Sequence, residues 1–264
     1  MKSKFVATLA LAGTLMAMAL AGCQSKPEKP SAAGSAAPAT RMTADRAHQV
    51  GREISEILVS KEKLLDSDKV SLYANRVGQY AAFHLDTGPK NMKCVGGGEK
   101  VLPPNGFRFA LVHSPEKETV ALPGGFIYIS DALLAELTSE DQLAGIFAHE
   151  ATNVVCQHGM ARMQKVADTV PVGKQAPRYE RLWKSTLPVR FKMVADRGAM
   201  MALYNGGYSP AAYIELVEKM GGPDSADRVA AMKKDFAKMQ SKGLVDTSKS
   251  RAARFADFKR MSGV

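Results

Sequence analysis

The sequence predicts an α+β domain that is predominantly helical, with a small β-sheet packed beside one central helix. Several long segments repeat apolar residues at spacings of three and four, the period of an amphipathic helix. Only three short stretches alternate apolar and polar residues, or run apolar, as strands do. The 264 residues, 45% hydrophobic and 23% charged, fit one globular domain with attachments.

The N-terminus resembles a bacterial lipoprotein signal. Lys2 and Lys4 precede an apolar run that ends in Leu20-Ala21-Gly22-Cys23. We expect residues 1–22 to be the signal peptide and Cys23 to be lipidated, with diacylglycerol and a further chain such as palmitate. Gln24 after the cysteine suggests the outer membrane, facing the periplasm. The alternative is an ordinary secretory signal with a chance cysteine.

Residues 23–42 form a tether rather than a folded segment. They are rich in Pro, Ala, Ser and Lys and show no apolar periodicity, so we expect them to hold the domain of residues 43–264 away from the membrane. The net charge of +10 suits anionic lipid or cell-wall polymer. No basic cluster is interleaved with aromatic residues, so we expect no nucleic-acid partner.

The first half of the domain contains two predicted helices and the three strands. Thr43-Ala44-Asp45 is typical of a helix start, and a second helix is expected from Ser67 to His84. Residues 87–105 form a loop rich in glycine. The strands are expected at 107–111, 120–122 and 126–129, the last two around Pro123-Gly124-Gly125.

The second half is helical. A short helix is expected at 131–137, and Thr138-Ser139-Glu140-Asp141 then caps a helix running to about Met163. On that helix His158 would lie nearly opposite His149 and face other packing. Further helices are expected at 188–204, 210–220, 226–242 and 248–261.

His149-Glu150-Ala151-Thr152-Asn153 is the motif that carries chemistry. In H-E-x-x-H zinc peptidases, two histidines four apart on a helix hold the metal and the glutamate activates its bound water. Here Asn153 stands where the second histidine belongs. An amide oxygen is a far weaker zinc ligand than imidazole.

Three segments carry a family resemblance: the run from Ala121 to Tyr128, the run from Thr138 to Gly145, and Ala148-His149-Glu150. In these segments the chain resembles the CAAX-prenyl-protease-like gluzincin metallopeptidases, whose bacterial periplasmic and outer-membrane members act in envelope protein quality control. The resemblance continues, over nearly the whole domain, through His158-Gly159, Ala195-Asp196, Gly207 to Pro210 and Thr247 to Arg254.

The resemblance also marks what this chain lacks. The family's third zinc ligand is a glutamate four residues before the aspartate that matches Asp196, and that position is Lys192 here. The family's Thr-His-Pro reads Thr247-Ser248-Lys249. His149 is therefore the only retained metal-ligand position. The resemblance implies a general-base position for Glu150, idle without metal, and a supporting position behind the histidine for Asp196.

Lys192 suggests a replacement for the metal charge. It lies four residues before Asp196, on one helix face, so we expect its ammonium to pair with Glu150, Asp196 or both. The alternative is a lysine exposed on the surface.

Two cysteines, Cys94 and Cys156, lie within the domain. In an oxidising envelope two cysteines often form a disulfide. The sequence leaves both possibilities open, a Cys94–Cys156 disulfide or two free thiols. Use of a thiol as a metal ligand or nucleophile is a third possibility, and shared metal coordination is disfavoured because Cys156 lies two helical turns from His149.

Two functions compete. In the first, the chain is a non-catalytic or regulatory envelope lipoprotein, a pseudoenzyme that needs no cofactor and binds peptides, envelope proteins or partner proteases in the retained cleft. In the second, it is an atypical metalloendopeptidase in envelope protein quality control that holds zinc in another geometry.

Overall fold

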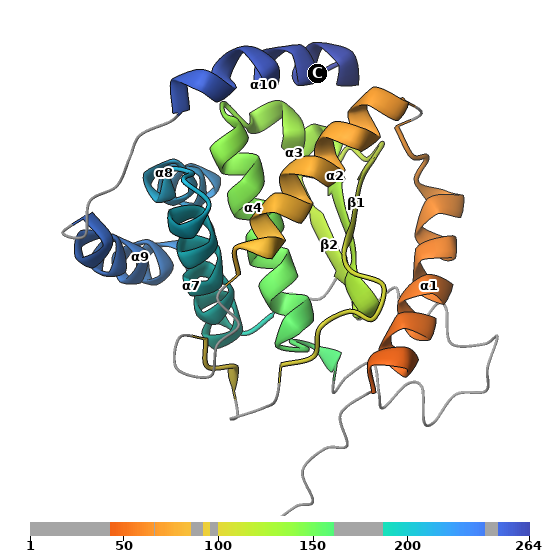
Figure 1. The fold of residues 1–264 in the computed structure, drawn as a ribbon, viewed down its shortest axis with the longest axis horizontal. Coiled ribbons are helices and arrows are strands. Elements are labelled where there is room, and N and C mark those ends of the chain that lie inside the picture. Colours follow the sequence, from red (N-terminus) through yellow and green to blue (C-terminus); the bar gives the residue numbers. More distant parts are fainter. Residues whose placement is uncertain (1–42, 66, 86–91, 96–99, 161–186, 241–247) are drawn as a thin grey trace, which may run out of the picture. The chain divides into compact units, whose positions relative to one another are not determined.

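The computed structural model describes residues 43–65, 67–85, 92–95, 100–160, 187–240 and 248–264 (Figure 1). It confirms an α+β fold that is mostly helical with one small sheet. The expected signal peptide and tether lie outside the described residues. Among the described helices, none is both long and apolar enough to span a membrane.

The sheet has three strands in the order β1-β3-β2. β1 (Arg108–Val112) pairs parallel to β3 (Phe126–Ser130), and β2 (Thr119–Leu122) pairs antiparallel to it. The turn η2 (Pro123–Gly125) joins β2 to β3 and places Gly124 at φ 73°, a conformation that favours glycine. Within this sheet β2 is an edge strand, and no strand among the described residues pairs with its outer edge.

Helix α1 (Ala44–Lys61) covers one face of the sheet, and α2 (Asp68–Phe83) and the central α4 (Glu140–Val155) cover the other (Figure 1). Alternation along β3 explains these layers, because successive side chains point to opposite faces. Phe126 and Tyr128 pack with α1, whereas Ile127 and Ile129 join the larger core around α4. Thr43 and Ser67 cap α1 and α2 through their side chains.

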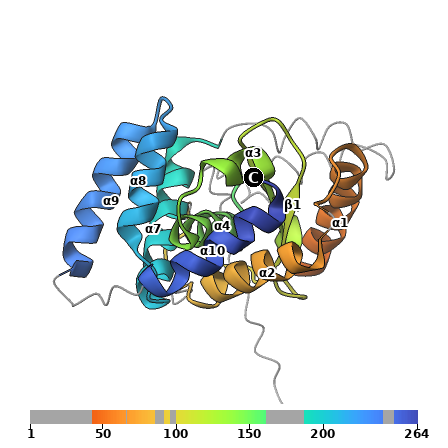
Figure 2. The ribbon, with the colours of Figure 1, turned by 90° about the horizontal axis from the view of Figure 1, so that it is seen from above.

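The other described helices are α3 (Asp131–Glu136), α7 (Val189–Asn205), α8 (Pro210–Met220), α9 (Ser225–Gln240) and α10 (Ser248–Ser262). α7, α8 and α10 pack against α4, whereas α9 packs against α7 and α8. From above, α7, α8 and α9 lie together on one side, and α10 crosses over α4 and α2 (Figure 2). α4 is therefore enclosed, and fourteen of its residues are buried.

Two arginines of α10 bind the N-terminal turn of α4. Arg251 donates from Nη2 to Asp141 Oδ1 at 2.6 Å and from Nε to Oδ2 at 3.1 Å. Arg254 pairs with Glu140, which also accepts from Tyr208 at 3.0 Å. These carboxylates lie where the helix dipole favours negative charge, so the ion pairs join the C-terminal helix to a position already suited to anions.

The expected extension of α4 to Met163 is wrong, because the helix ends at Val155. Gln157 adopts φ 51° and donates to Val154 O at 3.0 Å, and His158 donates to Asn153 O at 2.9 Å. These two bonds form a Schellman motif, which closes a helix through a left-handed residue. That residue is usually glycine, so the glutamine gave no signal of the helix end.

A disulfide joins Cys94 to Cys156, with the Cα atoms 5.2 Å apart. It ties the loop before β1 to the C-terminal end of α4, beside a bond from Val101 N to Val155 O of 2.9 Å. Both cysteines are buried, and neither thiol is left in this structure to bind a metal.

Candidate functional site

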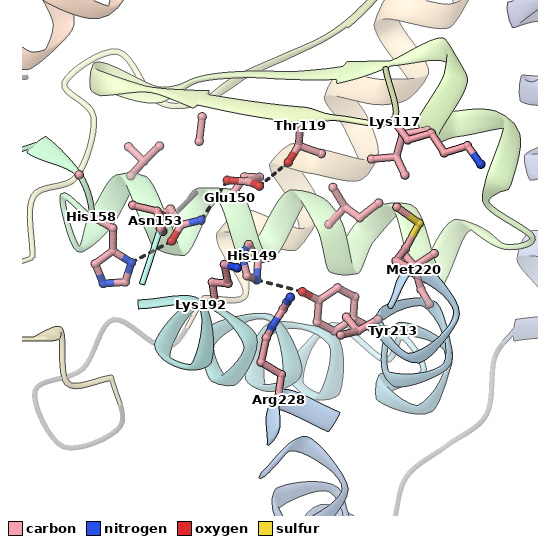
Figure 3. Close-up of a pocket in the computed structure, with 18 of the residues that line it drawn as sticks. Lys117, Thr119, His149, Glu150, Asn153, His158, Lys192, Tyr213, Met220 and Arg228 are labelled. Carbon is pink, nitrogen blue, oxygen red and sulfur yellow. Dashed lines mark hydrogen bonds between the residues drawn. The ribbon is translucent and has the colours of Figure 1, made fainter. Parts of the chain in front are cut away.

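A cleft of about 340 Å³ lies between β2 and α4 and is closed below by α7, α8 and α9 (Figure 3). Its polar lining includes His149, Glu150 and Asn153 from α4 and Thr119 from β2. Its apolar wall comes mainly from α3, α4 and α8, through Leu133, Ile146, Val154, Leu216, Val217 and Met220. The volume is within the range of small-molecule and side-chain binding pockets.

His149 is held from behind by α7 and α8. Its Nδ1 lies 2.9 Å from Asp196 Oδ1 and 2.9 Å from the hydroxyl oxygen of Tyr213, which itself donates to Asp196 at 3.0 Å. Because an ionised carboxylate only accepts, Nδ1 carries the proton of the pair. In the neutral ring, Nε2 then bears the lone pair, as it does in metal-binding histidines supported by a carboxylate.

Two glycines allow this approach of the helices. A Cβ on Gly198 of α7 would lie 2.2 Å from Thr152 Oγ1 on α4, and one on Gly145 of α4 would lie 2.5 Å from the Tyr213 ring. Any larger residue would push α7 or α8 away from α4. The glycines therefore set the distances at which Asp196 and Tyr213 reach His149.

Arg228 of α9 supplies the cation next to Asp196. Its Nε and Nη2 donate to Oδ2 and Oδ1, both at 2.7 Å, in the two-bond arrangement that guanidinium geometry favours. The expected pairing of Lys192 with Glu150 or Asp196 is wrong. Lys192 lines the cleft but donates to Asp224 at 2.8 Å, because the arginine fork already occupies both Asp196 oxygens.

These contacts determine the ionisation of Asp196. Burial would raise the pKa of its carboxyl group, but the hydrogen bonds from Arg228 and His149 and the positive charge of Arg228 outweigh burial and hold the pKa well below its usual range. Burial raises the pKa of the Tyr213 hydroxyl, and the charge of Asp196 raises it further. Tyr213 is therefore a neutral donor, and Asp196 an anion, at any pH near neutrality.

Replacing Asp196 with Asn should remove part of the acid dependence of stability. In the unfolded chain the pKa of an aspartate is near 3.9, and in the folded protein the pKa of Asp196 is lower. The ionised carboxylate therefore stabilises the fold at any pH above the unfolded pKa, and this stabilisation is lost as the pH falls through the folded pKa. We expect the variant to lose about 2 kcal/mol of unfolding free energy at pH 7, with the difference shrinking below about pH 4. Urea unfolding from pH 7 to pH 2 measures this.

The matched control is Asp257→Asn, because Asp257 is 60% exposed in its pair with Arg260. Its curve should follow that of the unmodified protein. A constant difference between Asp196→Asn and the unmodified protein down to pH 2 would contradict the linkage.

Glu150 and Asn153 form a second polar group. Glu150 accepts a bond from the Thr119 hydroxyl and one from Asn153 Nδ2 at 3.0 Å. Asn153 Oδ1 lies 2.8 Å from Nδ1 of His158. Both ends of the Asn153 amide are thus engaged within the protein (Figure 3).

His158 lines the cleft, contrary to the expectation that it faces away from His149. The chain has left the helix before this residue, so helical spacing no longer predicts its direction. Its ring contacts Phe191 of α7 edge-on, with the centroids 4.8 Å apart.

The donor set of this cleft does not suit a catalytic zinc ion, which needs three protein ligands and one open position. His149 fits. The Asn153 oxygen faces His158, and the Lys192 ammonium is a cation bound to Asp224. Over the described ranges, no three His, Cys, Asp or Glu side chains gather as a metal site. Thr247 and the side chains of Ser248 and Lys249 lie outside what the structure describes.

A model of Peptidase family M48 matches residues 99–175. The matched segment contains the sheet, α3 and α4, and so includes His149, Glu150 and Asn153. It supports a metallopeptidase-like fold. Asp196, Tyr213 and Arg228 lie beyond the matched M48 segment. No curated protein matches the chain.

The sequence predicted the site residues of α4 and Asp196 but did not indicate Thr119, Tyr213 or Arg228. Thr119 precedes the core residue Val120 in the strand, and successive side chains of a strand point to opposite faces. The side chain of Thr119 could therefore have been placed on the other face of the sheet once the strand was predicted. Arg228 gave no local signal, because it is one basic residue on a helix rich in lysine.

Proposed function

We propose that this chain is a non-catalytic member of the M48-like metallopeptidases, which binds a peptide or protein segment in the retained cleft. The observation that carries the proposal is the use of the Asn153 amide. Its nitrogen binds Glu150 and its oxygen faces His158, so it cross-links the site where a zinc ligand would be needed. Without zinc, water in the cleft has no group that lowers its pKa toward neutrality.

Retention of the cleft supports binding. In the part of the chain that the structure describes, the outer edge of β2 beside the cleft has no paired strand, and alternate residues Lys117, Thr119 and Ala121 line the cleft. An extended peptide can add to such an edge through its backbone, while the cleft receives one side chain. The apolar wall would then supply most of the binding free energy.

The alternative is an atypical zinc endopeptidase. One observation favours it, since His149 is oriented by Asp196 as zinc-binding histidines are, with Glu150 next to it. This function would require the cleft to reorganise, because Lys192 and the Asn153 amide would have to leave their partners.

Zinc content and proteolysis, measured together, test the proposal. We expect purified protein to contain less than about 0.1 zinc per chain after dialysis against micromolar zinc, and to leave casein intact, because only one of three ligands is present. One zinc per chain, with casein cleavage that Glu150→Gln abolishes, would overturn the proposal in favour of the alternative.

We further propose that the domain is held at the bacterial envelope through a lipid on Cys23, with residues 24–42 as the tether. The lipobox-like Leu20-Ala21-Gly22-Cys23 and the Pro- and Ala-rich stretch after it support this. Several acyl chains make an effectively permanent anchor, since each buried CH₂ contributes about 0.8 kcal/mol.

A Cys23→Ser variant should lose radiolabelled palmitate and should move from the membrane fraction to the soluble fraction. The matched control is Cys94→Ser, which should keep the label. Palmitate on the Cys23→Ser protein would contradict the anchor.

A further inference from the structure

The positive charges in the cleft are each paired with a carboxylate, whereas the negative charge of Glu150 has no ion pair among the described residues. Among the described residues, three lysine and arginine side chains line the cleft, and each is bound to a carboxylate. Lys192 lies 2.8 Å from Asp224, Arg228 lies 2.7 Å from Asp196, and Lys117 lies 2.6 Å from Glu136. An anionic ligand would have to compete with these pairs.

Glu150 is in the opposite situation. Its two hydrogen bonds within the described chain come from Thr119 and Asn153, which are both neutral. No ion pair joins Glu150 to a described lysine, arginine or histidine. Its carboxylate is half-buried, so its negative charge is less screened than on an open surface. A positive group entering the cleft would therefore be attracted to this position.

The hydrogen bonds of Glu150 and the apolar wall of the cleft favour some cationic groups over others. Each Glu150 oxygen already accepts one bond, which leaves less room for the two parallel bonds of an arginine fork than for a compact ammonium. The apolar wall, which includes Ile146, Leu216 and Val217, suits a hydrocarbon stem behind the charge.

From these contacts we propose that the cleft binds a primary ammonium group of a peptide on Glu150, the residue at the family's general-base position. The ammonium belongs to a lysine side chain or to a free N-terminus and takes the place of the metal charge. The proposal rests on the proposed function, because the cleft must bind peptide without cutting it.

Binding of short peptides tests this by isothermal titration calorimetry on the whole mature chain. The probe is a valine-rich pentapeptide, blocked at both ends, with one central lysine. A second has norleucine in place of lysine, and a third has norleucine and a free N-terminus. We expect the lysine or the free-terminus peptide to bind about tenfold to a hundredfold more tightly than the blocked norleucine peptide, the range for a hydrogen bond to a charged group. The tighter of the two identifies the source of the ammonium.

The same peptides are titrated into the variant Glu150→Gln, in which the side chain keeps its size and an acceptor oxygen but loses its charge. It should remove the preference for the charged peptide. The matched control Glu56→Gln makes the same change at an α1 residue that is 71% exposed, and should keep the preference. Because the peptide series is read on the unmodified protein, the test does not depend on the fold of a variant.

The outcomes separate the two proposals. Equal binding of all three peptides overturns ammonium recognition and leaves peptide binding intact. A charge preference that persists in Glu150→Gln also overturns it. Cleavage of the peptides with bound zinc overturns the proposed function itself, and failure of every peptide to bind overturns both.

Discussion

A variant carrying Asn153→His and Lys192→Glu should bind one zinc ion per chain, whereas the unmodified protein should not. The double change adds an imidazole one helical turn after His149 and a carboxylate on the facing helix, which completes three ligands. Loss of even one outer partner of a metal ligand costs about 10- to 100-fold in affinity. Adding two ligands should therefore raise zinc affinity by about a thousandfold or more.

Two neighbouring ion pairs determine whether the double variant keeps its fold, namely Arg228–Asp196 and Lys192–Asp224. Arg228 should remain on Asp196, because both its bonds avoid the changed residues. Asp224, which loses Lys192 as its partner, is 31% exposed and can be hydrated. Competition with a chromophoric chelator measures the affinity. The control adds His149→Ala to the double variant and should abolish binding. If the double variant binds no zinc, the retained scaffold is not that of a metal site.

Replacing Arg251 with Ala should destabilise the fold by about 3–5 kcal/mol, the range for breaking a buried ion pair from one side. The Arg251 side chain is 7% exposed and that of Asp141 is 2% exposed, so the change leaves a buried carboxylate with little access to water. The guanidinium also lies over the Tyr208 ring at 4.7 Å, and this contact is lost as well. Denaturant unfolding at pH 7 measures the change.

The matched control is Arg260→Ala on the same helix, since Arg260 and Asp257 are 77% and 60% exposed. It should change the unfolding free energy by less than about 1 kcal/mol. Adding Asp141→Asn to Arg251→Ala should recover part of the loss, because the unpaired charge is removed while Ser209 N keeps an acceptor. Equal effects of Arg251→Ala and Arg260→Ala would contradict a stabilising role of the buried pair.

Local pattern predicted the helices well where a cap or an amphipathic period was present. The segment expected at 210–220 is α8 with the same bounds, and 188–204 differs from α7 by one residue at each end. The error at the end of α4 arose because Gln157 takes a conformation that sequence reasoning assigns to glycine. That error also reversed the predicted direction of His158.

The sequence by itself determined the fold class, the helix that carries His149 and Glu150, and the presence of asparagine at the second histidine position of an H-E-x-x-H motif. Periodicity and motif spacing are local properties, so they can be read without a fold. Only the tertiary structure decided which cation lies beside Asp196. Spacing along α7 favoured Lys192, but Arg228 approaches from another helix with two bonds of 2.7 Å. The packing of segments that are distant in the sequence brings Arg228 to Asp196, so the sequence of neither segment alone predicts this ion pair.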